Sequence, residues 1–250
     1  EAPKPKDKEP RNRSVLDSWI AHAELTLDPE RQGRLSWLIA STVASAALQR
    51  VVDEAGVSRF SLKGGTLLQH KLGLASRATR DMDGIVRGDI DDFLEKMDEV
   101  LAEDWGPISF GRSEVEEIRV RAKLVNPRRF DLILSIKGET WRKVMVEISP
   151  DEGRAASSQE VVPAPPLDRF GLPNVDGIVG MSMSYQIAQK LHAATDPHNP
   201  PEYVNNRPRD VVDLLLLKEL SEVTGSPSLR DTRCACEDVF LARAQGARAL

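Results

Sequence analysis

Two short motifs combine residue types that could carry out chemistry at phosphorus. A Lys-Gly-Gly-Thr segment at 63–66 precedes an amphipathic stretch, and an Asp-Met-Asp segment follows at 81–83. A glycine pair offers bare backbone that a triphosphate can approach, and carboxylates at positions i and i+2 of a strand point the same way. Because phosphoryl chemistry needs mainly positioning and charge stabilisation, the pattern indicates metal-dependent nucleotidyl transfer from an NTP, with two magnesium ions. The candidate phosphate-binding residues are Lys63, Gly64, Gly65 and Thr66, and the candidate metal ligands are Asp81 and Asp83.

The segments around these motifs predict the elements that position them. Residues 60–62 end a strand-like run, and residues 66–72 carry Leu68 and Leu72 at helical spacing. The resulting order is strand, glycine turn, helix, loop and acidic strand, which lets a helix N-terminus face a pair of carboxylates across a cleft. Either motif alone also fits an ordinary turn, so the functional interpretation depends on their order.

A third carboxylate is expected, because two magnesium ions need several oxygen ligands. Glu147 lies in the otherwise apolar segment 144–148, where a charge needs a reason. Asp131, in the segment 130–134, is its rival. Alternation along a half-exposed strand would also explain either residue without a metal. Glu147 is the preferred third metal ligand.

Three segments resemble a known family. Residues 60–83 read FSLKGGTLLQHKLGLASRATRDMD, residues 184–193 read SYQIAQKLHA, and residues 207–214 read RPRDVVDL. In this order they closely resemble the motifs of the AbiEii/MenT nucleotidyltransferase toxins. The resemblance implies an α+β fold with a DNA polymerase β-like nucleotidyltransferase core, which has a mixed or antiparallel sheet, flanking helices and a C-terminal helical lobe. It also implies transfer of nucleotides from an NTP, with CTP favoured, to the 3′ end of tRNA, a block of aminoacylation and translation, and a cognate antitoxin.

The resemblance assigns roles to individual residues. The catalytic positions are Asp81, Asp83, Lys190 and Asp210, the phosphates are also bound by Lys190, and the supporting residues are Arg77, Arg207 and Asp213. By residue type alone, Lys190 also fits a solvated lysine on an amphipathic helix, and Asp210 fits a first-turn aspartate favoured by the helix dipole. Thr79 carries a hydroxyl two residues before Asp81, where a phosphoryl group would add about two negative charges beside the metal acids. That position is a hypothetical regulatory site.

Three functions compete on these residues. The leading hypothesis is an enzyme that adds nucleotides to tRNA. A second is an enzyme that uses the same metal site to nucleotidylate a hydroxyl of a protein or small molecule. A third is a catalytically inert protein that binds a nucleotide or a partner, and the intact motifs argue against it. The base of the NTP is selected by pocket shape, which these motifs do not encode.

The composition is that of a soluble globular protein. The 250 residues are 40% hydrophobic and 29% charged, with a net charge of −5. No apolar run approaches the ~20 residues that span a bilayer, and the N-terminus lacks the apolar core of a signal peptide, so a cytoplasmic location without membrane contact is expected. Cys234 and Cys236 are too close for an unstrained disulfide and are expected as reduced thiols. The expected division is a disordered tail at 1–13, a nucleotidyltransferase lobe at 14–160 and a helical lobe at 161–250.

The negative net charge still allows a local basic groove for RNA. The candidates are Arg77, Arg80, Arg87, Arg119, Arg121, Lys123, Arg128 and Arg129. Periodicity predicts strands at 117–125, 130–136 and 144–148, helices starting at Ser14, at 29–56, 89–103, 184–194, 208–223 and 228–249, and a loop at 150–181.

Overall fold

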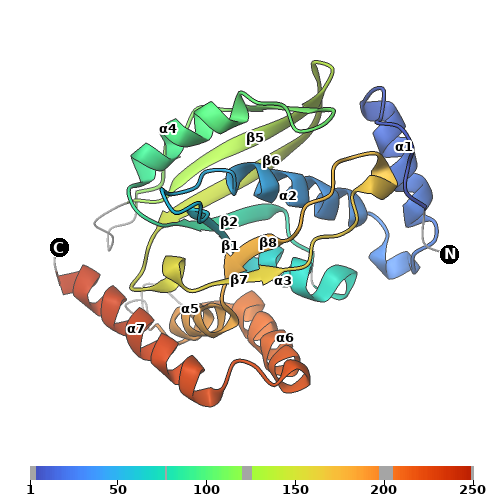
Figure 1. Ribbon diagram of the computed structural model, residues 1–250. Coiled ribbons are helices and arrows are strands. Elements are labelled where there is room, and N and C mark those ends of the chain that lie inside the picture. The colour runs from blue at the N-terminus through green and yellow to red at the C-terminus, as the bar shows by residue number, and fades with distance from the viewer. Residues whose placement is uncertain (1–3, 77, 120–125, 197–204, 249–250) are drawn as a thin grey trace.

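A mixed β-sheet with helices on one face and along one edge forms the molecule. The computed structural model describes residues 4–76, 78–119, 126–196 and 205–248 (Figure 1). In this part the sheet has eight strands in the order β3-β5-β6-β2-β1-β8-β7, with β4 paired to β5. The strands are β1 (Phe60–Lys63), β2 (Asp81–Val86), β3 (Ile108–Arg112), β4 (Glu116–Glu117), β5 (Arg128–Ile136), β6 (Glu139–Pro150), β7 (Gln159–Val162) and β8 (Ile178–Met181). The helices are α1 (Arg13–Glu24), α2 (Leu35–Leu48), α3 (Gly64–Leu72), α4 (Ile90–Leu101), α5 (Met183–Thr195), α6 (Pro208–Thr224) and α7 (Leu229–Arg248).

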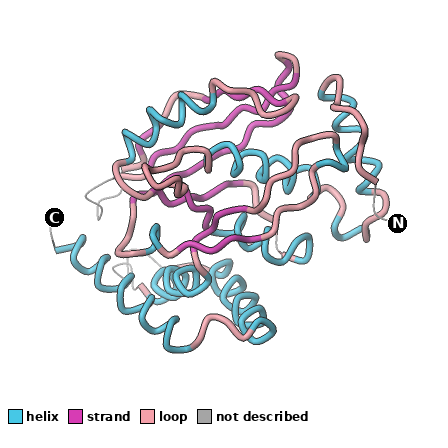
Figure 2. The backbone as a smooth tube through the Cα atoms, viewed as in Figure 1, coloured by secondary structure: helices cyan, strands magenta, loops and turns pink. Residues whose placement is uncertain are grey.

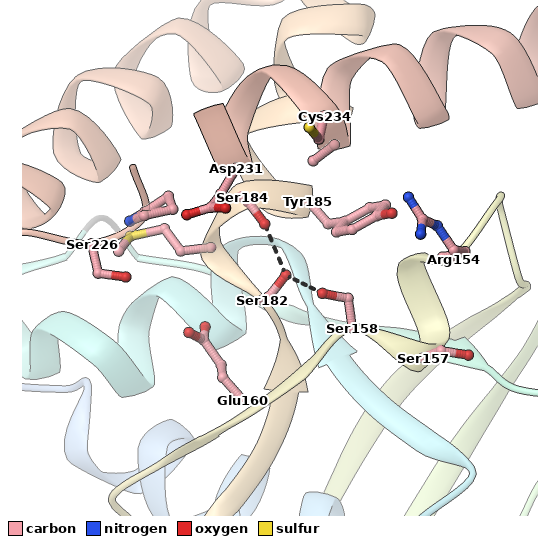
Figure 3. Close-up of a pocket in the computed structure, with 13 residues that line it drawn as sticks. Arg154, Ser157, Ser158, Glu160, Ser182, Ser184, Tyr185, Ser226, Asp231 and Cys234 are labelled. Atoms are coloured by element: carbon pink, nitrogen blue, oxygen red, sulfur yellow. Dashed lines mark hydrogen bonds between the residues drawn. The ribbon is translucent and has the colours of Figure 1, made fainter. Parts of the chain in front are cut away.

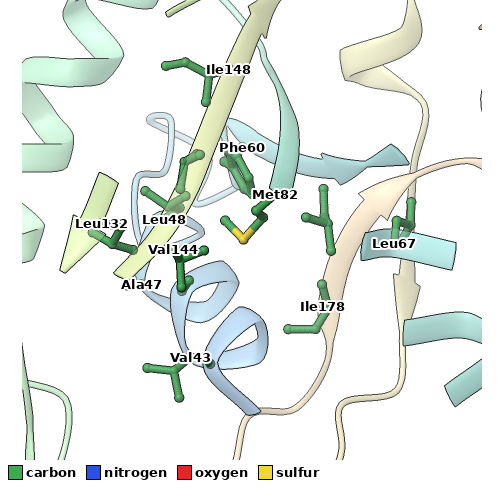
Figure 4. Close-up of a cluster of buried hydrophobic side chains, with 14 of the residues drawn as sticks. Val43, Ala47, Leu48, Phe60, Leu67, Met82, Leu132, Val144, Ile148 and Ile178 are labelled. Atoms are coloured by element: carbon green, nitrogen blue, oxygen red, sulfur yellow. The ribbon is translucent and has the colours of Figure 1, made fainter. Parts of the chain in front are cut away.

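One face of the sheet is packed and the other is partly open. Side chains of α2, including Val43 and Ala47, pack on the strands against Met82 and Val144 (Figure 4). Along β5, the even-numbered residues from Phe130 to Ile136 are buried, and they alternate with half-exposed residues. Since alternate strand residues point to opposite faces, the half-exposed positions of β5 and β6 lie on the open face. That is the face on which charged side chains can gather.

The helices α5, α6 and α7 lie together below the sheet in the view of Figures 1 and 2. Helix α5 packs against both α6 and α7. A small second core of Leu68, Met183 and Leu217 joins α3 to α5 and α6. The helix that begins with the glycine pair is therefore packed directly on the helical lobe. Within the described part of the chain, no helix combines the length and apolarity needed to cross a bilayer.

The expected α+β fold class is confirmed, and the elements differ from the prediction where strands are short or helices irregular. Helices α5 to α7 lie within about two residues of their predicted bounds. The helix predicted at 29–56 is wrong: a 3-10 turn occupies Pro29–Arg31, and α2 spans only Leu35–Leu48. The loop predicted at 150–181 contains β7 and β8, which have four residues each and are flanked by Ser, Pro and Gly. The strand β3 was not predicted, and most of the strand predicted at 117–125 lies outside the described residues.

Two segments have contacts that the composition did not indicate. The sheet extends to Met181, beyond the expected lobe boundary at 160. In the expected tail, the Lys6 N–H donates to the Asp168 carbonyl oxygen at 2.9 Å, the Lys6 ammonium lies 5.1 Å from the centre of the Trp19 ring, and Pro10 is buried. Lys6 and Pro10 therefore contact the folded part of the molecule, and the expected disorder of the tail stays a prediction. Cys234 and Cys236 are free thiols.

Gly84 tests how tightly β2 is packed on its buried face. A Cβ atom at Gly84 would lie 2.0 Å from a ring carbon of Phe60, whereas a Cβ at Gly111 in β3 would meet nothing within 4 Å. We expect Gly84→Ala to lower the free energy of unfolding by about 1–3 kcal/mol through overpacking. The control Gly111→Ala should change it by about 0.5 kcal/mol or less. Urea denaturation measures both, and equal losses would contradict this account.

Candidate active site

Strand pairing and alternation gather four of the predicted site residues on the open face. Lys63 of β1 and Glu147 of β6 are the register partners of Asp83 on either side of β2. Register partners on adjacent strands point to the same face, and Asp81, two residues from Asp83, points there too. Asp131 of β5 pairs instead with Met145, the neighbour of Asp81, and so lies one strand further from the aspartate pair. The register favours Glu147 over Asp131 as the third carboxylate.

The start of α3 touches the Asp83 carboxylate. Gly64 has a φ of +69°, and a Cβ atom there would lie 2.4 Å from Asp83 Oδ2. Only glycine meets both conditions without strain, because the positive φ disfavours a side chain and the carboxylate fills its place. The backbone of the glycine turn is therefore close to the acidic strand, as the order of the motifs predicted.

Asp83 is the electrostatic centre of this group. Its burial raises the pKa of Asp83 to about 6, with further increases from the Asp81 and Glu147 carboxylates, while Lys63 and Lys190 act in the opposite direction. The ammonium of Lys63 also lies 2.9 Å from Ser149 Oγ, to which it donates a hydrogen bond. Burial, with the smaller contributions of the two carboxylates, therefore outweighs the effect of the two lysines on the pKa of Asp83.

Two threonines position Asp81, which is itself exposed. The Thr66 hydroxyl donates to the Asp81 carbonyl oxygen at 2.6 Å, and the Thr79 hydroxyl donates to Asp81 Oδ1 at 2.8 Å. The structure thus gives the Thr66 hydroxyl a role in fixing β2, although we expected it among the phosphate-binding groups. A modification of Thr79 would remove a hydrogen bond that orients a candidate metal ligand.

Lys190 of α5 pairs with two acids of α6 and lies near enough to Asp83 to act on its pKa. Its ammonium lies 3.1 Å from Asp210 Oδ1 and 2.6 Å from Asp213 Oδ2 of α6. The Asp213 side chain is fully buried, and Arg207 lies 3.8 Å from the second oxygen of Asp210. The structure therefore brings together the predicted lysine and both predicted acids of the second half of the chain. Arg77 lies outside the described residues.

The arginines that were candidates for a basic groove do not all lie on one face of the sheet. Arg128 and Arg129 are neighbours in β5 and point to opposite faces: Arg128 pairs with Asp91 and Glu117, each at 3.4 Å, and Arg129 pairs with Glu147. Arg87 pairs with Asp53 at 2.8 Å. Arg80 and Arg119 are exposed, whereas Arg121 and Lys123 lie outside the described residues. Arg87 and Arg128 are thus corrected from groove residues to residues in structural ion pairs.

The residues fit a divalent cation in type and register. Carboxylate oxygens are the ligands that Mg²⁺ prefers, and a bound cation would favour the charged form of Asp83, whose pKa is raised chiefly by burial. In the described residues, no three His, Cys, Asp or Glu side chains are grouped so that they could hold a metal as they stand. Glu147 is bonded to Arg129 instead, at 3.0 Å. Asp81 and Asp83 are the residues that would hold the ion, and Glu147 would have to turn towards them.

A polar cavity of about 540 Å³ lies elsewhere, at the N-terminal end of α5 (Figure 3). The Ser182 hydroxyl lies 2.8 Å from that of Ser158 and 3.1 Å from that of Ser184. Tyr185 and Cys234 also line the cavity, which includes none of the predicted site residues. Sequence reasoning gave no signal for it, because Ser158 lies in a segment predicted as loop.

Comparison with known proteins agrees with the geometry of the acidic strand. The sequence profile of a family described as "Nucleotidyl transferase AbiEii toxin, Type IV TA system" matches residues 46–248. The chain belongs to this family. A comparison with curated protein sequences gives no match. The AbiEii assignment confirms the resemblance seen in the motifs and makes the chain a member of a family of nucleotidyltransferase toxins.

Several solved structures are similar to this AbiEii protein at low identity. The nucleotidyltransferase toxin MenT4 of Mycobacterium tuberculosis is 14% identical, with 93% of this chain and 98% of that chain covered and a TM-score of 0.47. An antigenic nucleotidyltransferase-like protein of Paracoccidioides brasiliensis is 13% identical, with coverages of 85% and 92% and a TM-score of 0.45. The antibiotic-resistance factor ANT(2'')-Ia is 14% identical, with coverages of 86% and 95% and a TM-score of 0.41.

Gly64 allows the contact between α3 and Asp83 to be tested. We expect Gly64→Ala to lower the free energy of unfolding by more than the ~1–2 kcal/mol that an alanine in the left-handed conformation costs, because the methyl group also displaces the Asp83 carboxylate. The displacement should reduce nucleotide transfer by about 100-fold. Gly56 has a φ of +76° and nothing within 4 Å of a Cβ, so Gly56→Ala carries the backbone strain alone. Thermal unfolding and transfer assays compare the two, and similar losses of activity would refute the contact.

The pKa of Asp83 predicts a pH-dependent stability. The folded-state pKa of about 6 lies above the ordinary 3.8, so the metal-free protein loses stability as the pH rises between these values. Asp83→Asn removes that loss and should stabilise the metal-free protein by about 1–2 kcal/mol at pH 7.5, discounted for partial exposure, and by much less at pH 3.5. Asp131→Asn removes an equal charge from the same face and is the control. Urea unfolding in a chelator at both pH values measures the difference, and a stabilisation that is independent of pH would be inconsistent with it.

Proposed function

We propose that this AbiEii nucleotidyltransferase transfers a nucleotide from an NTP to the 3′ end of tRNA and thereby blocks aminoacylation and translation. The observation that supports this most is the meeting of Asp83, Lys63 and Glu147 of the sheet with Lys190 of α5. Positive groups for phosphates and carboxylates for a metal lie together there. The tRNA acceptor and the preference for CTP come from the resemblance, and a cytoplasmic location with a cognate antitoxin goes with them.

Each residue has a distinct part in the proposed reaction. Asp81 and Asp83 would hold magnesium, with Glu147 as the third carboxylate, and two ions are expected. Bound magnesium neutralises charge on the phosphates as it develops. The backbone of Gly64 and Gly65 at the start of α3 presents N–H groups to phosphate oxygens.

The second group of residues acts from the helical lobe. Lys190 supplies an ammonium to the triphosphate, and Asp210 shares that ammonium. Lys63, the nearest cation from the sheet, balances Asp83 and can also reach a phosphate. Asp213 is fully buried and holds the Lys190 ammonium in place through their ion pair, while Arg207 orients Asp210.

The acceptor is tested by following the label from each NTP. Wild-type protein is incubated with magnesium and tRNA that carries an intact 3′-CCA end, tRNA that lacks it, or a protein extract. We expect label on the intact tRNA, with CTP as the best donor. Asp81→Asn should reduce the transfer by at least about 100-fold through the loss of a charge-stabilising ligand, and Asp131→Asn should retain it. Label found only in protein would support protein nucleotidylation instead, and an absence of label with any acceptor would support an inert binding protein.

A further inference from the structure

Arg129 and Glu147 form an ion pair on the open face of the sheet. Arg129 Nη2 donates to Glu147 Oε2 at 3.0 Å, and the two residues are register partners on β5 and β6. Their side chains are 43% and 32% exposed. The Nε atom of Arg129 is buried and has no hydrogen-bond partner in the described part of the chain. The guanidinium thus has part of its donor capacity unused in this arrangement.

Glu147 stands between two competing neighbours. On one side it pairs with Arg129 of β5, and on the other its register partner is Asp83 of β2. A carboxylate bonded to a guanidinium gives up oxygen lone pairs that a metal ion would use. The three carboxylates share a face, and among the described residues they do not form a group that could hold a metal while Glu147 is bonded to Arg129.

We propose that Arg129 is a positioning residue that holds Glu147 away from Asp81 and Asp83, and that Glu147 exchanges Arg129 for the divalent cation when the metal binds. The inference depends on the proposed function, because it takes the Asp81–Asp83 pair as the metal site. A half-exposed ion pair contributes little to stability, so the exchange is accessible. The released guanidinium faces the open side of the site, where phosphate oxygens of a nucleotide or acceptor are suitable partners.

Binding of Mn²⁺ in the absence of NTP tests the exchange without any assay of turnover. The loss of the free Mn²⁺ electron paramagnetic resonance signal gives the Kd for wild type, Arg129→Gln, Glu147→Gln and the double variant. Removal of the competitor should tighten Kd by about threefold to fivefold in Arg129→Gln. Arg128→Gln removes the same charge one residue along the strand, from the pair with Asp91 and Glu117, and should change Kd by less than about twofold.

The double variant separates competition for Glu147 from a general effect of charge. In the Glu147→Gln background, Arg129→Gln should have no larger effect than Arg128→Gln. Arg129→Lys keeps the positive charge and should bind Mn²⁺ within about twofold of wild type, and thermal unfolding checks that every variant is folded. Unchanged or weaker binding by folded Arg129→Gln, or an effect of equal size in the Glu147→Gln background, would overturn the inference. The proposed function fails separately, if wild type transfers no nucleotide while the coupling between Arg129 and Glu147 persists.

Discussion

The burial of the Asp83 carboxylate beside two other carboxylates on one face of the sheet is the constraint around which this site is organised. Asp81, Asp83 and Glu147 must share a face to bind one cation, yet burial, and then the neighbouring Asp81 and Glu147 carboxylates, raise the pKa of Asp83. The structure fixes the backbone that carries these residues: β2 is paired on both sides, and the Thr66 hydroxyl donates a hydrogen bond to the carbonyl oxygen of Asp81. Strand pairing and core packing elsewhere therefore offset the free energy that is lost by burying the charge of Asp83.

Lys190 has a structural role in addition to the phosphate-binding role that we propose for it, and replacing the residue removes both. Its ammonium balances Asp213, which is fully buried, so a neutral residue at position 190 leaves that carboxylate without its cation. Breaking a buried ion pair in this way typically lowers the free energy of unfolding by about 3–5 kcal/mol. A loss of activity on replacing Lys190 is thus expected from structure alone. Asp210 is 20% exposed and more accessible, so it is the better residue at which to separate the chemistry from the packing of α5 on α6.

The sequence predicted what local periodicity encodes and missed what depends on strand order. Alternation placed Asp81 and Asp83 on one face, and helical spacing located α5, α6 and α7. The choice between Glu147 and Asp131 needs the parallel pairing of β2 with β6, which joins segments about sixty residues apart and leaves no local signal. Arg128 and Arg129 looked like one basic patch because adjacency in sequence was taken as adjacency in space. In a strand, neighbours point to opposite faces: Arg129 pairs with Glu147 on the open face, whereas Arg128 pairs with Asp91 and Glu117.

The buried face of β2 fixes the site on its open face. Because side chains alternate with a period of two, a slip of one residue between β1 and β2 would turn Asp83 into the core and bring Met82 to the open face. The ring of Phe60 occupies the space where Gly84 has no side chain, so any larger residue at 84, or a shifted pairing, would collide with it. This contact places Lys63 opposite Asp83 and keeps Gly64 against the carboxylate. Gly84 has no side chain, yet its close packing against Phe60 thus helps to set the positions of Lys63 and Asp83 on the opposite face.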